Sequence, residues 1–319
     1  MPLPHGDLEV GRQRLYFHSS EAMPELGDGS VDVIVTSPPY NRGKRYHALY
    51  SDRLPEPEYR DLLLRVFREC HRVLAQEGAF FLNIGDAAGD QGKSERVVGW
   101  AQEAGFVRLQ TLVWVKSLLG KGHFTPTGRG RSFSNLFEYV FLLAKGRRPR
   151  LDVKAVGIPY ADKSNIGRYS EVDLRDAGNV WFVPYNETTG ARVKKGHEAP
   201  FPVELPWRAL RCVPRAERAL DPFAGTGATL RACEALGMEG VGYEPYPQIE
   251  VIRARLASPF TPPPTLLLPE LERSLRVLGD LLPKVPASEI EGLRARQRRD
   301  LRTAEALLRE LGARGSSKR

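Results

Sequence analysis

Short apolar runs of strand length alternate with helical segments along most of this 319-residue chain. The runs predict strands at 14–20, 31–36, 78–86, 109–116 and 135–146, and helices are expected at 56–76 and 95–104. Residues 217–246 then repeat the order of strand, glycine-rich turn, helix and strand. This alternation is typical of a sheet with helices on both faces, so the sequence predicts an α/β doubly wound fold.

Composition divides the chain into segments. Residues 1–258 are expected to form the main domain, since their length and apolar content allow a large core. Within it, residues 146–200 are polar, aromatic and turn-rich, which indicates an inserted or peripheral module. A stiff proline-rich linker is expected at 259–264, followed by a helical, basic C-terminal extension at 265–319.

Charge and cysteine content limit the class of protein. The formal net charge of +8 favours polyanionic partners, although part of the excess lies in the C-terminal extension. Cys70, Cys212 and Cys233 are too far apart in sequence for a zinc motif or a disulfide framework, so no metal is expected. No apolar run approaches the roughly 20 residues that cross a bilayer, and the N-terminus lacks the apolar segment of a signal peptide. We therefore expect a cytoplasmic protein without a membrane partner.

The segment Thr-Ser-Pro-Pro-Tyr at 36–40 ends the strand expected at 31–36. Two prolines cannot both continue a strand ladder, so they place an extended turn at the carboxyl end of the strand, where open α/β sheets bind ligands. Ser37 and the Pro38 carbonyl can accept hydrogen bonds from an amino group, while Tyr40 offers a face to a planar base. Ser37, Pro38, Pro39 and Tyr40 are therefore the candidate catalytic residues for methylation of an amine, a reaction that does not obviously require a strong general base.

The segment Asp-Pro-Phe-Ala-Gly-Thr-Gly at 221–227 lies between a strand and a helix. Its glycines permit close approach of the backbone to a ligand, and Glu244, roughly twenty residues on, can bind ribose hydroxyls. Asp221 would repel a pyrophosphate but suits a cation, which favours S-adenosylmethionine over a nucleotide cofactor. A purely structural turn is the alternative. The candidate cofactor-binding residues here are Asp221, Phe223, Ala224, Gly225, Thr226, Gly227 and Glu244.

The order of these two segments resembles that of the amino-group DNA methyltransferases of the β arrangement, in which the catalytic motif precedes the cofactor motif. The resemblance continues through LNIGD at 82–86, LVWVK at 112–116, NLFEYVFLLAKG at 135–146 and HEAPFPVEL at 197–205. It implies a seven-stranded, mostly parallel methyltransferase sheet whose order in the sequence is permuted. It also implies an enzyme that acts on double-stranded DNA and recognises its target through the 146–200 module. It also implies that Phe201 and Glu204 complete the cofactor pocket. His18, Ser19 and Ser20 replace an expected Gly-Asp pair.

The resemblance favours cytosine N4 as the target, since the family's adenine-N6 members more often carry aspartate where this chain has Ser37. Adenine N6 stays open, whereas methylation of cytosine carbon 5 would need a nucleophilic cysteine that no Pro-Cys motif supplies. A non-catalytic nucleic-acid binder and an enzyme acting on RNA or protein are more distant alternatives.

Basic residues in two segments are candidate DNA contacts. The glycine-rich loop at 120–135 could clamp phosphates, and the 146–200 module places basic residues near aromatic ones; the alternatives are a solvated loop and a small module core. The candidates are Lys121, Arg129, Arg131, Arg168, Arg192, Lys194 and Lys195. The family also makes a restriction-modification role, a homodimer and a cognate restriction endonuclease possible.

Overall fold

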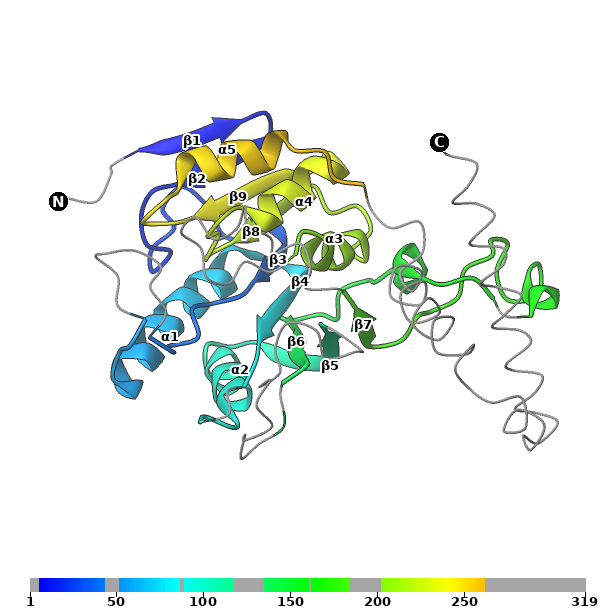
Figure 1. Ribbon diagram of the computed structural model, residues 1–319, viewed down its shortest axis with the longest axis horizontal. Coiled ribbons are helices and arrows are strands. Elements are labelled where there is room, and N and C mark those ends of the chain that lie inside the picture. Colours follow the sequence, from blue (N-terminus) through cyan, green and yellow to red (C-terminus); the bar gives the residue numbers. More distant parts are fainter. Residues whose placement is uncertain are drawn as a thin grey trace, which may run out of the picture. The chain divides into compact units, whose positions relative to one another are not determined.

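Figure 1 shows a computed structural model of the chain. The structure describes residues 6–43, 52–86, 89–116, 133, 135–160, 162–183 and 202–261. Within this part, one sheet of nine strands runs in the order β1-β2-β9-β8-β3-β4-β6-β5-β7. The strands are β1 (Asp7–Val10), β2 (Gln13–Tyr16), β3 (Val31–Thr36), β4 (Leu74–Ile84), β5 (Val107–Val115), β6 (Phe137–Ala144), β7 (Val180–Phe182), β8 (Arg218–Asp221) and β9 (Glu239–Tyr243).

The centre of the sheet is parallel. Strand β3 pairs in parallel with β4 and β8, and β9 pairs in parallel with β8 and β2. Strand β6 runs antiparallel between β4 and β5. The predicted α/β sheet is confirmed, but the expected number of seven strands is wrong. The outer arm of an antiparallel hairpin, β1, and the three-residue strand β7 add one strand to each edge.

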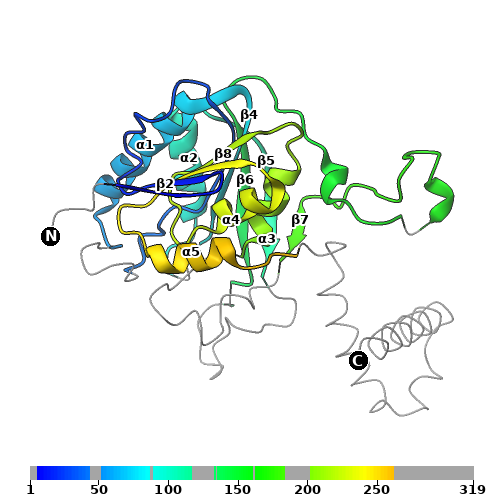
Figure 2. The same cartoon turned by 90° about the horizontal axis from the view of Figure 1, so that it is seen from above.

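Helices cover both faces of the sheet (Figure 2). Helices α1 and α2 pack together on one face, where Tyr59 meets the edge of Trp100 at 5.6 Å between ring centroids. Helices α3, α4 and α5 lie on the other face, where α4 contacts both of its neighbours. The helices are α1 (Glu56–Val73), α2 (Lys93–Glu103), α3 (Glu204–Arg211), α4 (Ala228–Leu236) and α5 (Ile249–Ala257).

The β-branched and aliphatic residues of β3 explain its central place. Val31, Val33 and Ile34 are fully buried, as a strand covered on both faces requires. Helix α1 follows the predicted apolar stripe but ends at Val73 and not at 76, because Leu74 is extended and begins β4 at once. The buried face of α1 includes Leu63, Phe67 and Cys70, so the histidine that follows, His71, lies on a different face of the helix.

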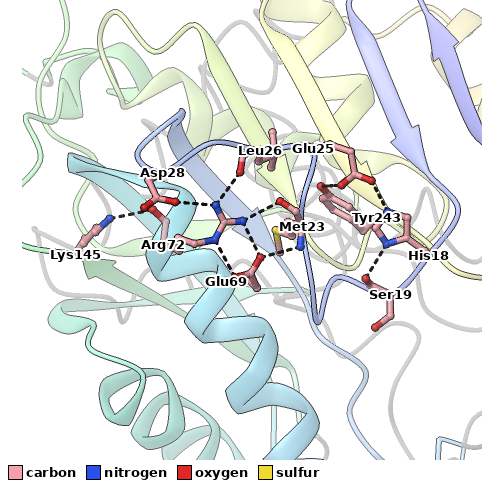
Figure 3. Close-up of polar contacts among 10 residues, drawn as sticks. All are labelled: His18, Ser19, Met23, Glu25, Leu26, Asp28, Glu69, Arg72, Lys145 and Tyr243. Atoms are coloured by element: carbon pink, nitrogen blue, oxygen red, sulfur yellow. Dashed lines mark hydrogen bonds and ion pairs between the residues drawn. The ribbon is translucent and has the colours of Figure 1, made fainter.

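Arg72, near the end of α1, fixes the loop that leads from β2 to β3 (Figure 3). Its guanidinium donates to the carbonyls of Met23 and Leu26, both at 2.8 Å, and to the carboxylates of Glu69 and Asp28. The hydrogen bonds and charge of Arg72 outweigh the effect of burial and hold the pKa of Glu69 below its usual value. This anchor positions the start of β3, whose other end carries the Ser-Pro-Pro-Tyr segment.

The described part of the 146–200 module contains two short 3₁₀ helices, η1 (Val153–Val156) and η2 (Lys163–Asn165), and projects beyond the β7 edge in Figure 1. Helix α3 holds it: the Asp152 N–H donates to the Cys212 carbonyl at 2.8 Å, and Arg211 donates to the Ala155 carbonyl at 2.7 Å. Residues 262–319 lie outside the described part, so half of the expected linker and all of the C-terminal extension stay predictions. No helix of the described residues is long and apolar enough to span a membrane.

Candidate active site

The two sequence motifs meet at the carboxyl ends of adjacent strands. Thr36 ends β3 and Asp221 ends β8, and the Thr36 hydroxyl donates to Asp221 Oδ1 at 2.6 Å. Thr229, at the start of α4, ties this helix to β3 by donating to the Val35 carbonyl at 3.3 Å. Residues about 185 apart in the chain therefore form one site at the edge where doubly wound sheets bind ligands.

Side chains from neighbouring elements hold the backbone of the Ser-Pro-Pro-Tyr segment. Tyr59 of α1 donates to the Pro39 carbonyl at 2.7 Å, and Lys93 of α2 donates to the Tyr40 carbonyl at 2.7 Å. Among the described residues, the Pro38 carbonyl has no hydrogen-bond donor. This carbonyl is the acceptor that the sequence singles out.

The hydroxyls of the segment form a directed chain of hydrogen bonds. Ser37 Oγ donates to the Tyr40 hydroxyl at 3.2 Å, and the Tyr40 hydroxyl donates to Glu138 Oε2 at 2.8 Å. Asn83 Oδ1 lies farther from the Tyr40 hydroxyl, at 3.3 Å, and its own amide donates to the Tyr139 carbonyl. Glu138 forms an ion pair with Lys116, which follows β5.

The charged side chains at the end of this series of hydrogen bonds are buried. The side chains of Glu138 and Lys116 are only 12% and 11% exposed. Burial would raise the pKa of Glu138, but Lys116 and the hydrogen bonds outweigh burial and lower it, so the carboxylate is ionised. Burial, together with the negative charge of Glu138, raises the pKa of Tyr40 well above its usual value. The phenol therefore keeps its proton at neutral pH.

Sequence reasoning quoted the segments around Asn83, Lys116 and Glu138 but did not identify these residues as part of the site. The available signal was a charged residue next to an apolar strand: Glu138 follows the first residue of β6, and Lys116 follows the last residue of β5. Antiparallel pairing of β5 with β6 brings Val115 opposite Phe137 and so places the two charges side by side.

The glycine-rich turn between β8 and α4 needs its glycines. Gly225 and Gly227 have φ values of 51° and 77°, in the left-handed region that other residues rarely adopt. The Gly225 N–H donates to Glu244 at 3.0 Å, and the Tyr246 N–H donates to the same carboxylate at 3.1 Å. The turn and the end of β9 therefore form one backbone cradle around Glu244.

Two carboxyl groups at this cradle, those of Asp221 and Glu244, have raised pKa values. Burial raises the pKa of Asp221 to about 6, despite hydrogen bonds from the Thr36 hydroxyl and the Phe223 N–H that favour its ionised form. Asp221 Oδ2 is buried and accepts no hydrogen bond from the described residues. Burial also raises the pKa of Glu244 to about 7. Both groups would be stabilised by a ligand that brings positive charge or hydrogen-bond donors.

The other candidates of the turn are buried or half-buried. Phe223 is half-buried and packs on the core, while Ala224 and Thr226 are buried, and the Ala224 N–H donates to the Tyr243 carbonyl at 3.0 Å. Nearby, His18, at the position where a Gly-Asp pair was expected, contacts Glu25 at 2.8 Å, and Glu25 accepts from Tyr243 at 2.9 Å (Figure 3). This group occupies the end of β2 beside β9.

The remaining candidates make other contacts or fall outside the described residues. Glu204, the first residue of α3, pairs with buried Arg208, which also donates to the Phe182 carbonyl at 2.9 Å. Arg168 lies over the Tyr169 ring at 5.0 Å in the peripheral module. The candidates outside the described residues are Lys121, Arg129, Arg131, Arg192, Lys194, Lys195 and Phe201. Among the described residues, no cluster of ligands could hold a metal ion.

A comparison with protein families matches residues 31–253 to a DNA methylase family of the N6 and N4 type. The chain belongs to this family. The match spans both motifs and confirms the amino-group DNA methyltransferase predicted from the sequence. Curated relatives include the type II methyltransferases M.MthZI of Methanothermobacter thermautotrophicus and M.MjaI of Methanocaldococcus jannaschii. They are 26% and 25% identical to this methyltransferase, over 72% of its chain and over 72% and 86% of their own.

Solved structures share the fold of this methyltransferase. TTHA0409 of Thermus thermophilus is 26% identical, with a TM-score of 0.52, over 76% of this chain and 94% of its own. The cytosine-N4-specific PvuII DNA methyltransferase is 20% identical, with a TM-score of 0.60, over 77% of this chain and 86% of its own. A further structure of TTHA0409 contains S-adenosyl-L-methionine.

Proposed function

We propose that this methyltransferase transfers a methyl group from S-adenosylmethionine to the exocyclic amino group of a base in double-stranded DNA, with cytosine N4 as the preferred target. The observation that carries the proposal is the hydrogen bond from Thr36 to Asp221, because it sets the Ser-Pro-Pro-Tyr segment beside the glycine-rich turn. A base held by the Ser-Pro-Pro-Tyr segment can then meet a cofactor held by the glycine-rich turn.

The residues of the turn fit this cofactor. S-adenosylmethionine supplies a methyl group on a positively charged sulfonium. Asp221 has a buried oxygen without a donor among the described residues, and Glu244 stands at the strand end suited to ribose hydroxyls. Phe223, Ala224, Gly225, Thr226 and Gly227 would form the wall of the pocket, and Phe201 and Glu204 would complete it.

The residues of the Ser-Pro-Pro-Tyr segment fit an exocyclic amine. Ser37 Oγ and the Pro38 carbonyl would accept its two hydrogens, so that the nitrogen lone pair points toward the methyl group. The Tyr40 ring would stack on the base, and Arg42, over that ring at 4.9 Å, holds the ring in place by also donating to the Gly85 carbonyl. The target must leave the duplex to reach this site, which costs a few kcal/mol of unstacking.

The remaining roles are proposals about recognition. Residues 146–200 would recognise the target sequence, with Arg168, Arg192, Lys194 and Lys195 contacting DNA, while Lys121, Arg129 and Arg131 would clamp phosphates. The central strand β8 comes late in the sequence, so the strands of the methyltransferase sheet would occur in a permuted order along the chain. The type II relatives support a restriction-modification role in the cytoplasm, with a cognate endonuclease and a homodimer as proposed partners.

The test is to incubate the protein with mixed-sequence duplex DNA and methyl-labelled S-adenosylmethionine, and to identify the labelled nucleoside by digestion and mass spectrometry. We expect N4-methylcytosine. N6-methyladenine would keep the enzyme class and overturn the target, whereas cofactor binding without any labelled nucleoside would contradict the proposed reaction on DNA.

A further inference from the structure

Methylation of an exocyclic amine releases a proton, which must be transferred away from the amine at the Ser-Pro-Pro-Tyr segment. The nitrogen forms a bond to the methyl carbon, the carbon–sulfur bond breaks, and its electron pair neutralises the sulfonium. The nitrogen is then cationic until it loses one of its original hydrogens as a proton. A site closed to water needs an acceptor for this proton, since a proton trapped on the product would keep its charge in a low-dielectric environment.

We propose that Glu138 is the terminal acceptor of this proton, which reaches it through the hydroxyls of Ser37 and Tyr40. The inference rests on the proposed function, because it takes Ser37 as the group that touches the amine. The amine gives its proton to Ser37 Oγ, Ser37 passes its own proton to Tyr40, and Tyr40 passes its proton to Glu138 Oε2. Three O–H bonds form, and one N–H and two O–H bonds break, so that Glu138 ends neutral and both hydroxyls are restored.

The hydrogen bonds already point in the required direction. Ser37 donates to Tyr40 at 3.2 Å, and Tyr40 donates to Glu138 at 2.8 Å. A hydroxyl carries one hydrogen, and Tyr40 directs it toward the ionised Glu138 because that contact is shorter than the one to Asn83 and involves a charge. Ser37 Oγ therefore keeps its lone pairs available for the hydrogen of an incoming amine.

The surroundings of Glu138 keep it ready to accept a proton. Lys116 from the end of β5 neutralises its charge, Asn83 faces it from β4, and Tyr40 approaches from the segment after β3. A carboxylate in this pair is ionised at neutral pH and remains a far stronger base than a neutral exocyclic nitrogen of a nucleobase. Proton transfer along the chain is therefore downhill after the methyl group has moved.

Three sequence segments that have no catalytic role in the proposed function contribute residues to this proton path. LNIGD supplies Asn83 and Gly85, LVWVK supplies Lys116, and NLFEYVFLLAKG supplies Glu138. Gly85 is required for the approach, because a Cβ at this position would lie 2.6 Å from Glu138 Cγ. Strands that are distant in sequence thus place one carboxylate behind the tyrosine, which a role in packing alone would not require.

The test compares Tyr40→Phe, Glu138→Gln and the double variant with the wild type in single-turnover methylation of duplex DNA. Phenylalanine keeps the stacking ring, and glutamine keeps an acceptor for the tyrosine hydroxyl, but each breaks the proton path. We expect each variant to be about 100-fold slower, the low end for general acid–base catalysis, with dissociation constants for cofactor and DNA within about twofold of wild type. The double variant should be no slower than the slower single variant. Tyr139→Phe, which removes a neighbouring tyrosine hydroxyl, is the matched control and should leave the rate unchanged.

Two further readouts separate a proton path from a purely structural role. At saturating cofactor, where protonation of Asp221 does not limit binding, the wild-type rate should fall on the acid side as Glu138 becomes protonated, and Glu138→Gln should lack this acid limb. Without cofactor, carbon-13 NMR of the glutamate carboxyls, assigned with Glu138→Gln, should show Glu138 ionised at neutral pH. A Glu138→Gln rate within threefold of wild type with the same acid limb, or a Glu138 protonated at neutral pH, would overturn the inference. Failure of the wild type to methylate DNA would instead overturn the proposed function.

Discussion

Thr36 Oγ1 donates a 2.6 Å hydrogen bond to Asp221 Oδ1 between the ends of neighbouring parallel strands. Both residues are buried, so the bond has little competition from water and fixes the distance between the two motifs. The bond also leaves the second oxygen of Asp221 without a donor among the described residues. The same contact therefore joins the halves of the site and prepares one of them for a ligand.

Thr36→Val should weaken both the fold and the cofactor site. Valine matches the shape of threonine but leaves Asp221 with one donor fewer, which should lower the free energy of unfolding by about 1–3 kcal/mol. We expect cofactor affinity, measured by calorimetry, to fall about tenfold, equivalent to about 1.4 kcal/mol. Thr36→Ser keeps the hydroxyl and should behave as wild type; an equal loss in both variants would contradict the role given to the hydrogen bond.

The raised pKa of Asp221 should make stability depend on pH. Its pKa is about 6 in the folded state against 3.8 for an ordinary aspartate, so between pH 4 and pH 6 the folded state holds a proton that the unfolded state has lost. Stability without cofactor should therefore fall as pH rises through this window, by roughly 2–3 kcal/mol in total. Cofactor binding should strengthen over the same range, because the carboxylate becomes charged.

Asp221→Asn tests this linkage. The variant should be more stable than wild type above pH 6, with a flatter profile of denaturant stability between pH 4 and pH 6, and it should bind cofactor more weakly. A variant whose stability profile keeps the wild-type slope would show that another group titrates there.

Gly85→Ala should disable the site with a modest effect on folding. The added Cβ would lie 2.6 Å from Glu138 Cγ, so Glu138 must move away from Tyr40. We expect a loss of stability of about 1–3 kcal/mol from overpacking, together with a larger loss of single-turnover rate. Gly99→Ala in α2, where the new Cβ meets nothing within 4 Å, is the matched control and should be neutral or stabilising.

The buried pair of Arg208 and Glu204 should matter far more than an exposed pair. Arg208 is 1% exposed and links α3 to β7 through the Phe182 carbonyl. Arg208→Met leaves Glu204 without this cation, and we expect a cost of about 3–5 kcal/mol in chemical denaturation. Arg60→Met breaks the exposed pair with Glu103, at 2.7 Å, and should cost less than about 1 kcal/mol. Similar costs for the two variants would show that α3 does not depend on its buried pair.

Much of the fold follows from local patterns in the sequence. The apolar run that forms β3 has its predicted ends, since the two prolines that follow stop the ladder. Strand β1 was missed because its four residues include exposed Asp7 and Glu9, which give no apolar run. Strand β7 was missed because three residues inside a turn-rich segment carry no periodicity. Such edge strands depend on pairing with a neighbour and not on their own composition.

The candidate site was predictable only where one segment carries its own chemistry. Ser37, Tyr40 and Asp221 stand in short motifs whose residue types suit an amine and a cation. Glu138 and Lys116 gain a role only through strand register, which sets Ile84 of β4 opposite Tyr139 of β6, and Val115 of β5 opposite Phe137. Register across three strands is a tertiary property, so the sequence alone indicated their segments but not their contact.

The most direct test separates cofactor binding from methyl transfer by substituting residues of the two motifs. S-adenosylmethionine binding, measured by calorimetry, and methyl label incorporated into duplex DNA should be compared for wild type, Ser37→Ala, Tyr40→Ala and Asp221→Ala. We expect Ser37→Ala and Tyr40→Ala to bind the cofactor nearly as wild type but to transfer almost no label, whereas Asp221→Ala should bind it weakly. Equal loss of cofactor binding in all three variants, or full label transfer by Ser37→Ala, would contradict this expectation.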